Sequence, residues 1–232
     1  MPDFLLRSLY NMELKNIKVG FLGDSITYGV GTSNCENNYE GYRFPDLFAN
    51  LAGAKAYNYG VSGTRIAKQR VPIPYEPEAG HYILRVDKME PELDVIVVFG
   101  GTNDFGHGDA PLGCFSDRGD DTFYGALHSL IIKLINKYPK ATLVFLTPLH
   151  RTGEETCFNA FGLRREPLIK YINAIREVAE YYSLPVLDLY KNSGLQPSVD
   201  VIRELYLPDG LHPSDLGAQK IANMLYSFLK TL

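Results

Sequence analysis

The 232-residue sequence contains no tryptophan and only three cysteines. Tyrosine, by contrast, is abundant (16 residues); many of its rings could line a binding cleft, although we expect most of them in the core or at its rim. Cys35, Cys114 and Cys157 are far apart and odd in number, so they predict neither a disulfide framework nor a metal-ligand pattern. We therefore expect reduced, structural thiols, no bound metal and no cofactor.

Long hydrophobic runs are also missing. The longest apolar runs are the size of a β-strand, well short of the roughly 20 residues of a membrane-spanning helix. Near the N-terminus there is no apolar stretch of the about 7–15 residues that a secretory signal needs. We therefore expect no membrane insertion and a cytoplasmic location, unless a leader has been removed from the chain.

Positive charge is neither abundant nor clustered. The formal net charge is −4, and Arg164-Arg165 is the only pair of adjacent basic residues. A surface that follows nucleic-acid phosphates needs clustered cations. Nucleic acid is therefore not an expected partner, a small molecule is, and nothing in the sequence indicates an oligomeric state.

What the sequence does contain is an alternation of strand-sized and helix-sized segments. Five short runs are predicted strands, and where their hydrophobicity is continuous rather than alternating, as in Val95–Phe99, it predicts strands buried on both faces, as in a parallel sheet. These runs are Ile17–Leu22, Lys55–Tyr59, Val95–Phe99, Thr142–Leu146 and Val186–Leu189.

The segments that separate or follow these runs have apolar residues at the period of an amphipathic helix. Three such faces are Phe123, Leu127, Leu130, Leu134 and Tyr138; Leu168, Ile172, Ile175, Val178 and Tyr182; and Gly217, Ile221, Leu225 and Phe228. Alternating strands and helices imply right-handed crossovers, with helices on both faces of the sheet. We predict one domain over residues 1–232, with its core at about 16–231, folded as a three-layer α/β/α sandwich.

Three loop-like segments do not fit the alternation: Val71–Gly80, Asp104–Asp121 and His150–Gly162. Each follows a predicted strand, directly or after a short interval. Ligands of open α/β sheets bind at the carboxyl ends of the strands, and long loops in compact domains are commonly functional. These segments are therefore predicted to wall the binding site.

Residues suited to catalysis follow the first three predicted strands. Ser25 stands at a strand-to-helix turn, where its hydroxyl could lie over the free N–H groups of a helix; it could equally cap that helix. Gly60 would let the backbone approach a substrate, or simply form a turn. Asn103, in Gly-Gly-Thr-Asn-Asp, could aim its amide into the same crevice or form an Asx-turn.

A fourth motif, Asp209-Gly210-Leu211-His212, lies near the C-terminus. A carboxylate three residues before a histidine can accept the imidazole N–H, which fixes the tautomer and leaves the other ring nitrogen free as a base. Its place in a loop before a helix favours a functional histidine over a core or surface one.

The four motifs, in this order, resemble the signature blocks of the GDSL/SGNH hydrolase family, with Gly-Asp-Ser-Ile-Thr in place of the usual Gly-Asp-Ser-Leu. The resemblance implies a flavodoxin-like fold of five parallel strands in the order 2-1-3-4-5. It also implies Ser25 as nucleophile, His212 as general base and Asp209 as its partner. The oxyanion hole that it implies consists of the Ser25 and Gly60 amides and the Asn103 side chain.

Other classes of protein fit less well. A G-x-S-x-G elbow, which an α/β-hydrolase would need, is absent, as are both G-x-G-x-x-G and the P-loop. His81, His107, Asp109 and Asp120 lack the spacing of a metal-hydrolase site. A binding module without catalytic activity stays open, because a fold alone does not prove activity.

The substrate is the least defined feature of this sequence. We expect a serine ester hydrolase that forms an acyl-enzyme on small-acyl esters, with O-acetylated carbohydrate as one candidate. The polar loops favour this over the alternative, a lysophospholipase or thioesterase for longer acyl chains, which would need an apolar groove. The candidate substrate contacts, each of which could instead be an ordinary loop residue, are Tyr75, His81, Phe105, His107, Arg151 and Phe158.

Overall fold

The computed structural model describes residues 12–33, 42–70 and 80–232, and within them a five-stranded sheet organises the chain. All neighbouring strands pair in parallel, in the order β2-β1-β3-β4-β5, which confirms the predicted order. The strands are β1 (Lys18–Gly23), β2 (Lys55–Gly60), β3 (Val95–Phe99), β4 (Thr142–Leu146) and β5 (Val186–Leu187).

The prediction for the last strand was two residues too long. β5 ends at Leu187 because Asp188 begins a new helix, α8 (Leu189–Asn192), and its side chain accepts the backbone N–H of Lys191. Asp188 is thus a helix cap and not a strand residue, as short acidic side chains often are at such positions.

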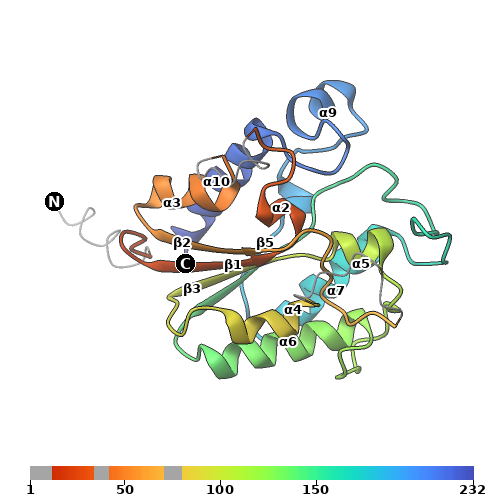
Figure 1. Cartoon of the computed structure of the whole chain (residues 1–232), viewed down its shortest axis with the longest axis horizontal. Coiled ribbons are helices and arrows are strands. Elements are labelled where there is room, and N and C mark those ends of the chain that lie inside the picture. Colours follow the sequence, from red (N-terminus) through yellow and green to blue (C-terminus); the bar gives the residue numbers. More distant parts are fainter. Residues whose placement is uncertain (1–11, 34–41, 71–79) are drawn as a thin grey trace.

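Helices cover both faces of the sheet. In Figure 1, α3 (Phe44–Ala52) and α10 (Asp215–Leu229) lie on one side, whereas α6 (Phe123–Lys137) and α7 (Leu168–Tyr181) lie on the other. The shorter helices are α2 (Ser25–Tyr28), α4 (Tyr82–Arg85), α5 (Thr102–His107) and α9 (Asp200–Tyr206), with a 3-10 turn at Val86–Lys88.

The core consists of two apolar layers that share the strands. In β3, Ile96 and Val98 pack with the α6 and α7 side, whereas Val95 and Val97 pack with the α3 and α10 side. Burial on both faces explains why the β3 sequence is continuously apolar, whereas β2 has no fully buried residue and contains Lys55 and Asn58. The predicted helix residues Leu127, Leu130 and Ile172 are also buried, as expected.

The strand register brings the chemically interesting turns to one edge. Gly23 at the end of β1 pairs with Gly60 of β2 on one side and with Phe99 of β3 on the other. The residues that follow β1 and β3 form α2 and α5, which lie near the same edge of the sheet in Figure 1.

Two of the predicted loop segments can be described. Asp104–Asp121 is not a loop throughout, because its first residues belong to α5. This helix starts directly after Gly101, which has a left-handed backbone conformation (φ +104°). Residues 150–162 do lack a regular helix, and Phe158 forms an isolated antiparallel bridge with Arg164. Apart from Gly80, Val71–Gly80 lies outside the described residues.

Candidate active site

Ser25 is the first residue of α2, but it does not cap that helix. Asp24 does: its side chain accepts the N–H of Ile26 at 3.0 Å. The Ser25 hydroxyl instead lies 3.0 Å from Nε2 of His212, a residue 187 positions away in sequence. The structure therefore decides against the simple capping interpretation of Ser25.

The Asp209 carboxylate holds the His212 ring through a tight turn. One oxygen accepts the backbone N–H groups of Leu211 and His212, at 2.9 and 2.7 Å, and the other lies 2.6 Å from Nδ1 of His212. Partial burial alone would raise the pKa of Asp209, but these hydrogen bonds, led by the ring contact, outweigh it and lower the pKa. An ionised Asp209 keeps the proton on Nδ1 and leaves Nε2 free to accept.

The loop after α2 fixes the histidine turn against the serine turn. A Cβ on Gly31 would lie 2.8 Å from the Pro213 carbonyl oxygen and 3.0 Å from Cβ of His212, so only glycine allows this approach. Nearby, the Ser33 amide donates to Asp215 at the start of α10. These contacts hold the loop after α2 against the segment before α10, next to the place where Ser25 and His212 meet.

Asn103 is the second residue of α5 and is 5% exposed. Its Nδ2 donates to the Thr64 carbonyl oxygen at 3.1 Å, and its Oδ1 lies 3.1 Å from Nε2 of His107. Asn103 therefore does not use its side chain to form an Asx-turn. An amide nitrogen has two hydrogens. Among the described residues only one of them is used, so the other can donate to a ligand.

Gly60 has a different environment from the one expected. Its N–H already donates to Asn58 Oδ1 at 2.8 Å, and a Cβ there would lie 2.2 Å from the Tyr28 nitrogen. Its backbone is therefore packed against the end of α2. Gly63, three residues later, is left-handed (φ +76°), and nothing lies within 4 Å of where its Cβ would be.

Gly63 is thus an open backbone position that sequence reasoning missed. Within the described residues, its N–H makes no hydrogen bond. Both glycines stand in Gly60-Val61-Ser62-Gly63, and the only available signal was that the motif contains a second glycine. Which one faces the site depends on hydrogen bonds that a sequence pattern does not reveal.

Buried charges that sequence reasoning also missed hold the Gly63 loop. Arg85 donates to the Gly23 carbonyl oxygen at 3.0 Å and to the Thr64 hydroxyl at 3.1 Å. Asp104 accepts the amides of Ile66 and Ala67, at 3.0 and 2.9 Å. Burial raises the pKa of Asp104 to about 6, against the lowering effect of these two amides.

The candidate substrate contacts divide into different environments. His81 is 6% exposed, with Nε2 3.2 Å from an Asp120 oxygen. Phe105 is 1% exposed and belongs to the core, where the Arg165 guanidinium lies 3.4 Å from its ring centre. Phe158 is 60% exposed at the tip of its loop. Tyr75 lies outside the described residues.

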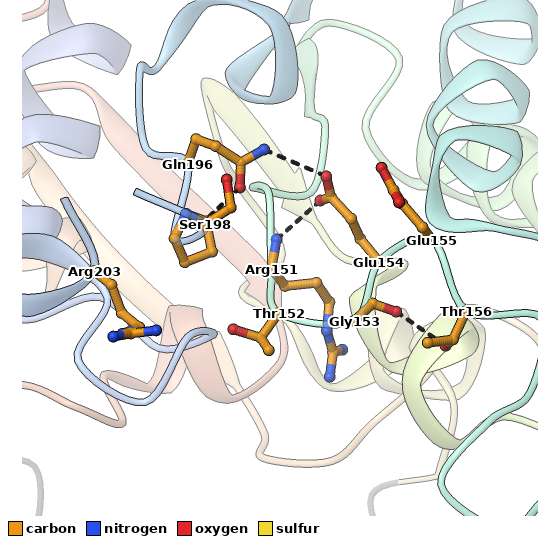
Figure 2. A pocket seen from close by; sticks show the side chains of 10 residues that line it. Arg151, Thr152, Gly153, Glu154, Glu155, Thr156, Gln196, Ser198 and Arg203 are labelled. Atoms are coloured by element: carbon orange, nitrogen blue, oxygen red, sulfur yellow. Dashed lines mark hydrogen bonds between the residues drawn. The ribbon is translucent and has the colours of Figure 1, made fainter. Parts of the chain in front are cut away.

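His107 and Arg151 lie next to the Asn103 helix. His107 contacts Asn103 directly, as described above, and Arg151 donates from Nη1 to the Thr102 carbonyl oxygen at 2.9 Å. Arg151 also lines a polar pocket of about 410 Å³ together with the rest of segment 151–156, residues 196–198 and Arg203. Figure 2 shows this pocket, with hydrogen bonds from Gln196 and from the Arg151 amide to the Glu154 carboxylate.

The polar pocket adjoins the Asp209 turn. The Thr152 amide in its wall donates to the Gly210 carbonyl oxygen at 2.8 Å. In the described residues no group of three or more His, Cys, Asp and Glu side chains is arranged to hold a metal ion. The same residues contain no helix long and apolar enough to cross a membrane.

The fold and the site together define the class: a three-layer α/β protein in which a serine, a histidine and an aspartate join at the carboxyl edge of a parallel sheet. A model of the GDSL-like lipase/acylhydrolase family matches residues 21–220. The chain belongs to this family, as its sequence motifs predicted, and is therefore a hydrolase.

Solved structures share this fold. A protein from Lactobacillus plantarum is 30% identical with a TM-score of 0.75, over 93% of this chain and 97% of that one. A protein described as a possible lipase from Chitinophaga pinensis is 23% identical (TM-score 0.67; 91% and 97% covered). The lipase/acylhydrolase from Enterococcus faecalis is 20% identical (TM-score 0.58; 92% and 95% covered). No curated protein matches the chain.

Proposed function

We propose that the protein is a serine ester hydrolase that forms an acyl-enzyme on Ser25. The observation that carries the proposal is the continuous contact from Asp209 through His212 to Ser25, with distances of 2.6 and 3.0 Å. These are hydrogen-bond distances, and the order of groups is that of a nucleophile, its base and the residue that orients the base.

The reaction follows from these contacts. Nε2 of His212 takes the Ser25 hydroxyl proton as Oγ bonds to the acyl carbon, and the imidazolium is stabilised by Asp209. As the tetrahedral intermediate collapses, the bond to the alcohol oxygen breaks and His212 returns the proton to that oxygen. Water then repeats the sequence, releases the acid and restores the Ser25 hydroxyl.

Three donors suit the oxyanion of this intermediate: the Ser25 amide, the Asn103 Nδ2 group and a glycine amide. We assign the glycine donor to Gly63 rather than Gly60, because the Gly60 N–H already binds Asn58 Oδ1. The Ser25 amide is at the start of α2, where helix N–H groups have no intrahelical partner. Donors fixed in advance are worth most where charge develops.

The substrate class that we propose is an ester of a small acyl group and a polar alcohol. Ser25 and His212 do not line the pocket beside the Asp209 turn, but Arg151, Glu154 and Arg203 in its wall favour hydroxyl-rich compounds such as O-acetylated carbohydrate over a long alkyl chain in this neighbourhood. A lysophospholipase or thioesterase would need an extended apolar groove.

The test is a chain-length series of p-nitrophenyl esters, from acetate to palmitate, together with acetylated sugars. The wild-type protein is expected to prefer acetate, and Ser25→Ala, which removes only one oxygen atom, is expected to abolish turnover. Peak activity at eight carbons or more would transfer the assignment to a lipid substrate. A folded wild-type protein without turnover of any ester would favour the binding-module alternative.

A further inference from the structure

Arg65 and His107 connect the Gly63 loop to helix α5, which carry two of the three proposed oxyanion donors. Arg65 is 2% exposed, and its Nη1 lies 3.2 Å from the Gly63 carbonyl oxygen and 3.1 Å from Nδ1 of His107. The opposite ring nitrogen of His107, Nε2, lies 3.1 Å from Oδ1 of Asn103. One chain of contacts therefore runs from the Gly63 turn to the Asn103 amide.

The guanidinium decides which nitrogen of His107 carries the proton. Arg65 only donates hydrogen bonds and stays charged at every physiological pH, so Nδ1 must accept and the proton must be on Nε2. Burial and the nearby charges of Arg65 and Arg151 lower the pKa of His107 to about 4, which keeps the ring neutral. The neutral ring then donates from Nε2 to Asn103.

This donor in turn fixes the orientation of the Asn103 amide. With Oδ1 accepting from His107, Nδ2 faces the Thr64 carbonyl oxygen. A flipped amide would set its NH₂ group against the Nε2–H of His107 and its oxygen against the Thr64 oxygen. Both of these contacts would be repulsive. The Asn103 amide is therefore restricted to the orientation that places its NH₂ group on the side of the Gly63 loop.

We propose that His107 and Arg65 are positioning residues of the active site, which hold the Asn103 amide and the Gly63 turn in the geometry that binds the oxyanion. The proposal rests on the proposed ester hydrolysis. Neither residue needs to contact the substrate. His107 thus has a role other than the substrate contact that was expected from the sequence. Arg65, in turn, acts by holding other residues of the protein in place.

The variants that test it differ in the hydrogen bonds they keep. His107→Leu removes both bonds of the ring, whereas His107→Gln keeps an amide donor for Asn103 and an oxygen that can accept from Arg65. Removing one oxyanion donor outright typically costs about 10²–10³-fold in kcat. Because a misoriented Asn103 still samples the correct geometry, we expect His107→Leu to lower kcat about 10–100-fold with KM within about twofold, and His107→Gln to recover most of it.

The matched control is His128→Leu. His128 is a buried histidine that, like His107, has both ring nitrogens bonded, here to Tyr182 and Phe115, but it lies in α6. Its loss is expected to lower the melting temperature and leave kcat unchanged. Any of three results would overturn the proposal. They are equal losses of kcat in His107→Leu and His107→Gln, a kcat of wild-type size in His107→Leu, and a change in KM alone.

An NMR measurement separates this proposal from the proposed function. Long-range ¹H–¹⁵N correlations of the histidine rings in the wild-type protein report the tautomer of His107 without any need for turnover. The Nε2–H form supports the assigned orientation of Asn103, and the Nδ1–H form overturns it. A wild-type protein that shows the Nε2–H form but hydrolyses no ester would refute only the hydrolase.

Discussion

The contacts of Asp209 allow one substitution to be predicted in detail, namely Asp209→Asn. The oxygen that accepts the Leu211 and His212 amides must remain an oxygen, because two N–H groups converge on it at 2.9 and 2.7 Å. The asparagine NH₂ group is then forced to the position 2.6 Å from Nδ1 of His212. Since that group donates, Nδ1 has to accept, and the ring proton moves to Nε2.

A proton on Nε2 points at Ser25, so the ring can no longer take the hydroxyl proton. A wrong tautomer of this kind costs about 10⁴ in kcat in a serine protease, and we expect a loss of about 10³–10⁴-fold, or about 4–5.5 kcal/mol in the barrier. Asp209→Ala should lose less, because the Asp209 side chain is 55% exposed and water can accept the Nδ1 proton in its place.

The assay is kcat on p-nitrophenyl acetate for Asp209→Asn, Asp209→Ala and the wild type, with circular dichroism to verify folding. We expect the asparagine variant, although closer in shape to the wild type, to be the less active of the two variants. An asparagine variant that is more active than the alanine variant, or within tenfold of the wild type, would refute the tautomer argument.

Three further outcomes are expected. Asn103→Ala should lower kcat by about 10²–10³, and near-normal kcat on every ester tested would remove Asn103 from the oxyanion hole. Gly60→Ala should lower the free energy of unfolding by about 2 kcal/mol or more, because its Cβ would lie 2.2 Å from the Tyr28 nitrogen; an unchanged denaturation midpoint would contradict this packing. As the pH falls from 6.5 to about 4, His107 becomes protonated in the unfolded chain but stays neutral in the folded one. This difference lowers the free energy of unfolding by up to about 3 kcal/mol. Asp24 and Asp104, whose pKa values burial raises, act in the opposite sense. Urea denaturation of wild type and His107→Gln at both pH values isolates the His107 contribution, and parallel losses in the two proteins would contradict it.

The sheet could be predicted because its strands have a simple physical signature. β3 is buried and apolar at every position, and β4 is buried and apolar at all but its first residue, Thr142, so the bounds of both strands were predicted correctly. β5 has only two residues, and its predicted end was wrong since Asp188 serves a helix. The gross fold follows from burial, whereas element ends depend on individual side-chain hydrogen bonds.

The site was predictable where its groups lie in one short motif or where the family resemblance pairs them, as it does Ser25 and His212 across 187 positions. The Asp209–His212 contact arises within one turn, and the sequence spacing alone predicted it. The His107–Arg65 contact joins residues 42 positions apart, and neither residue forms a motif with the other. The role of this contact emerges only when the tautomer of the half-buried His107 ring is worked out from its neighbours.

Covalent labelling determines whether Ser25 is a nucleophile. The protein is treated with a fluorophosphonate, digested, and analysed by peptide mass spectrometry. We expect one adduct, on the peptide that contains Ser25, with none in Ser25→Ala and a much slower reaction in His212→Ala. A folded wild-type protein that stays unlabelled, or that is labelled on another residue, would contradict this role of Ser25.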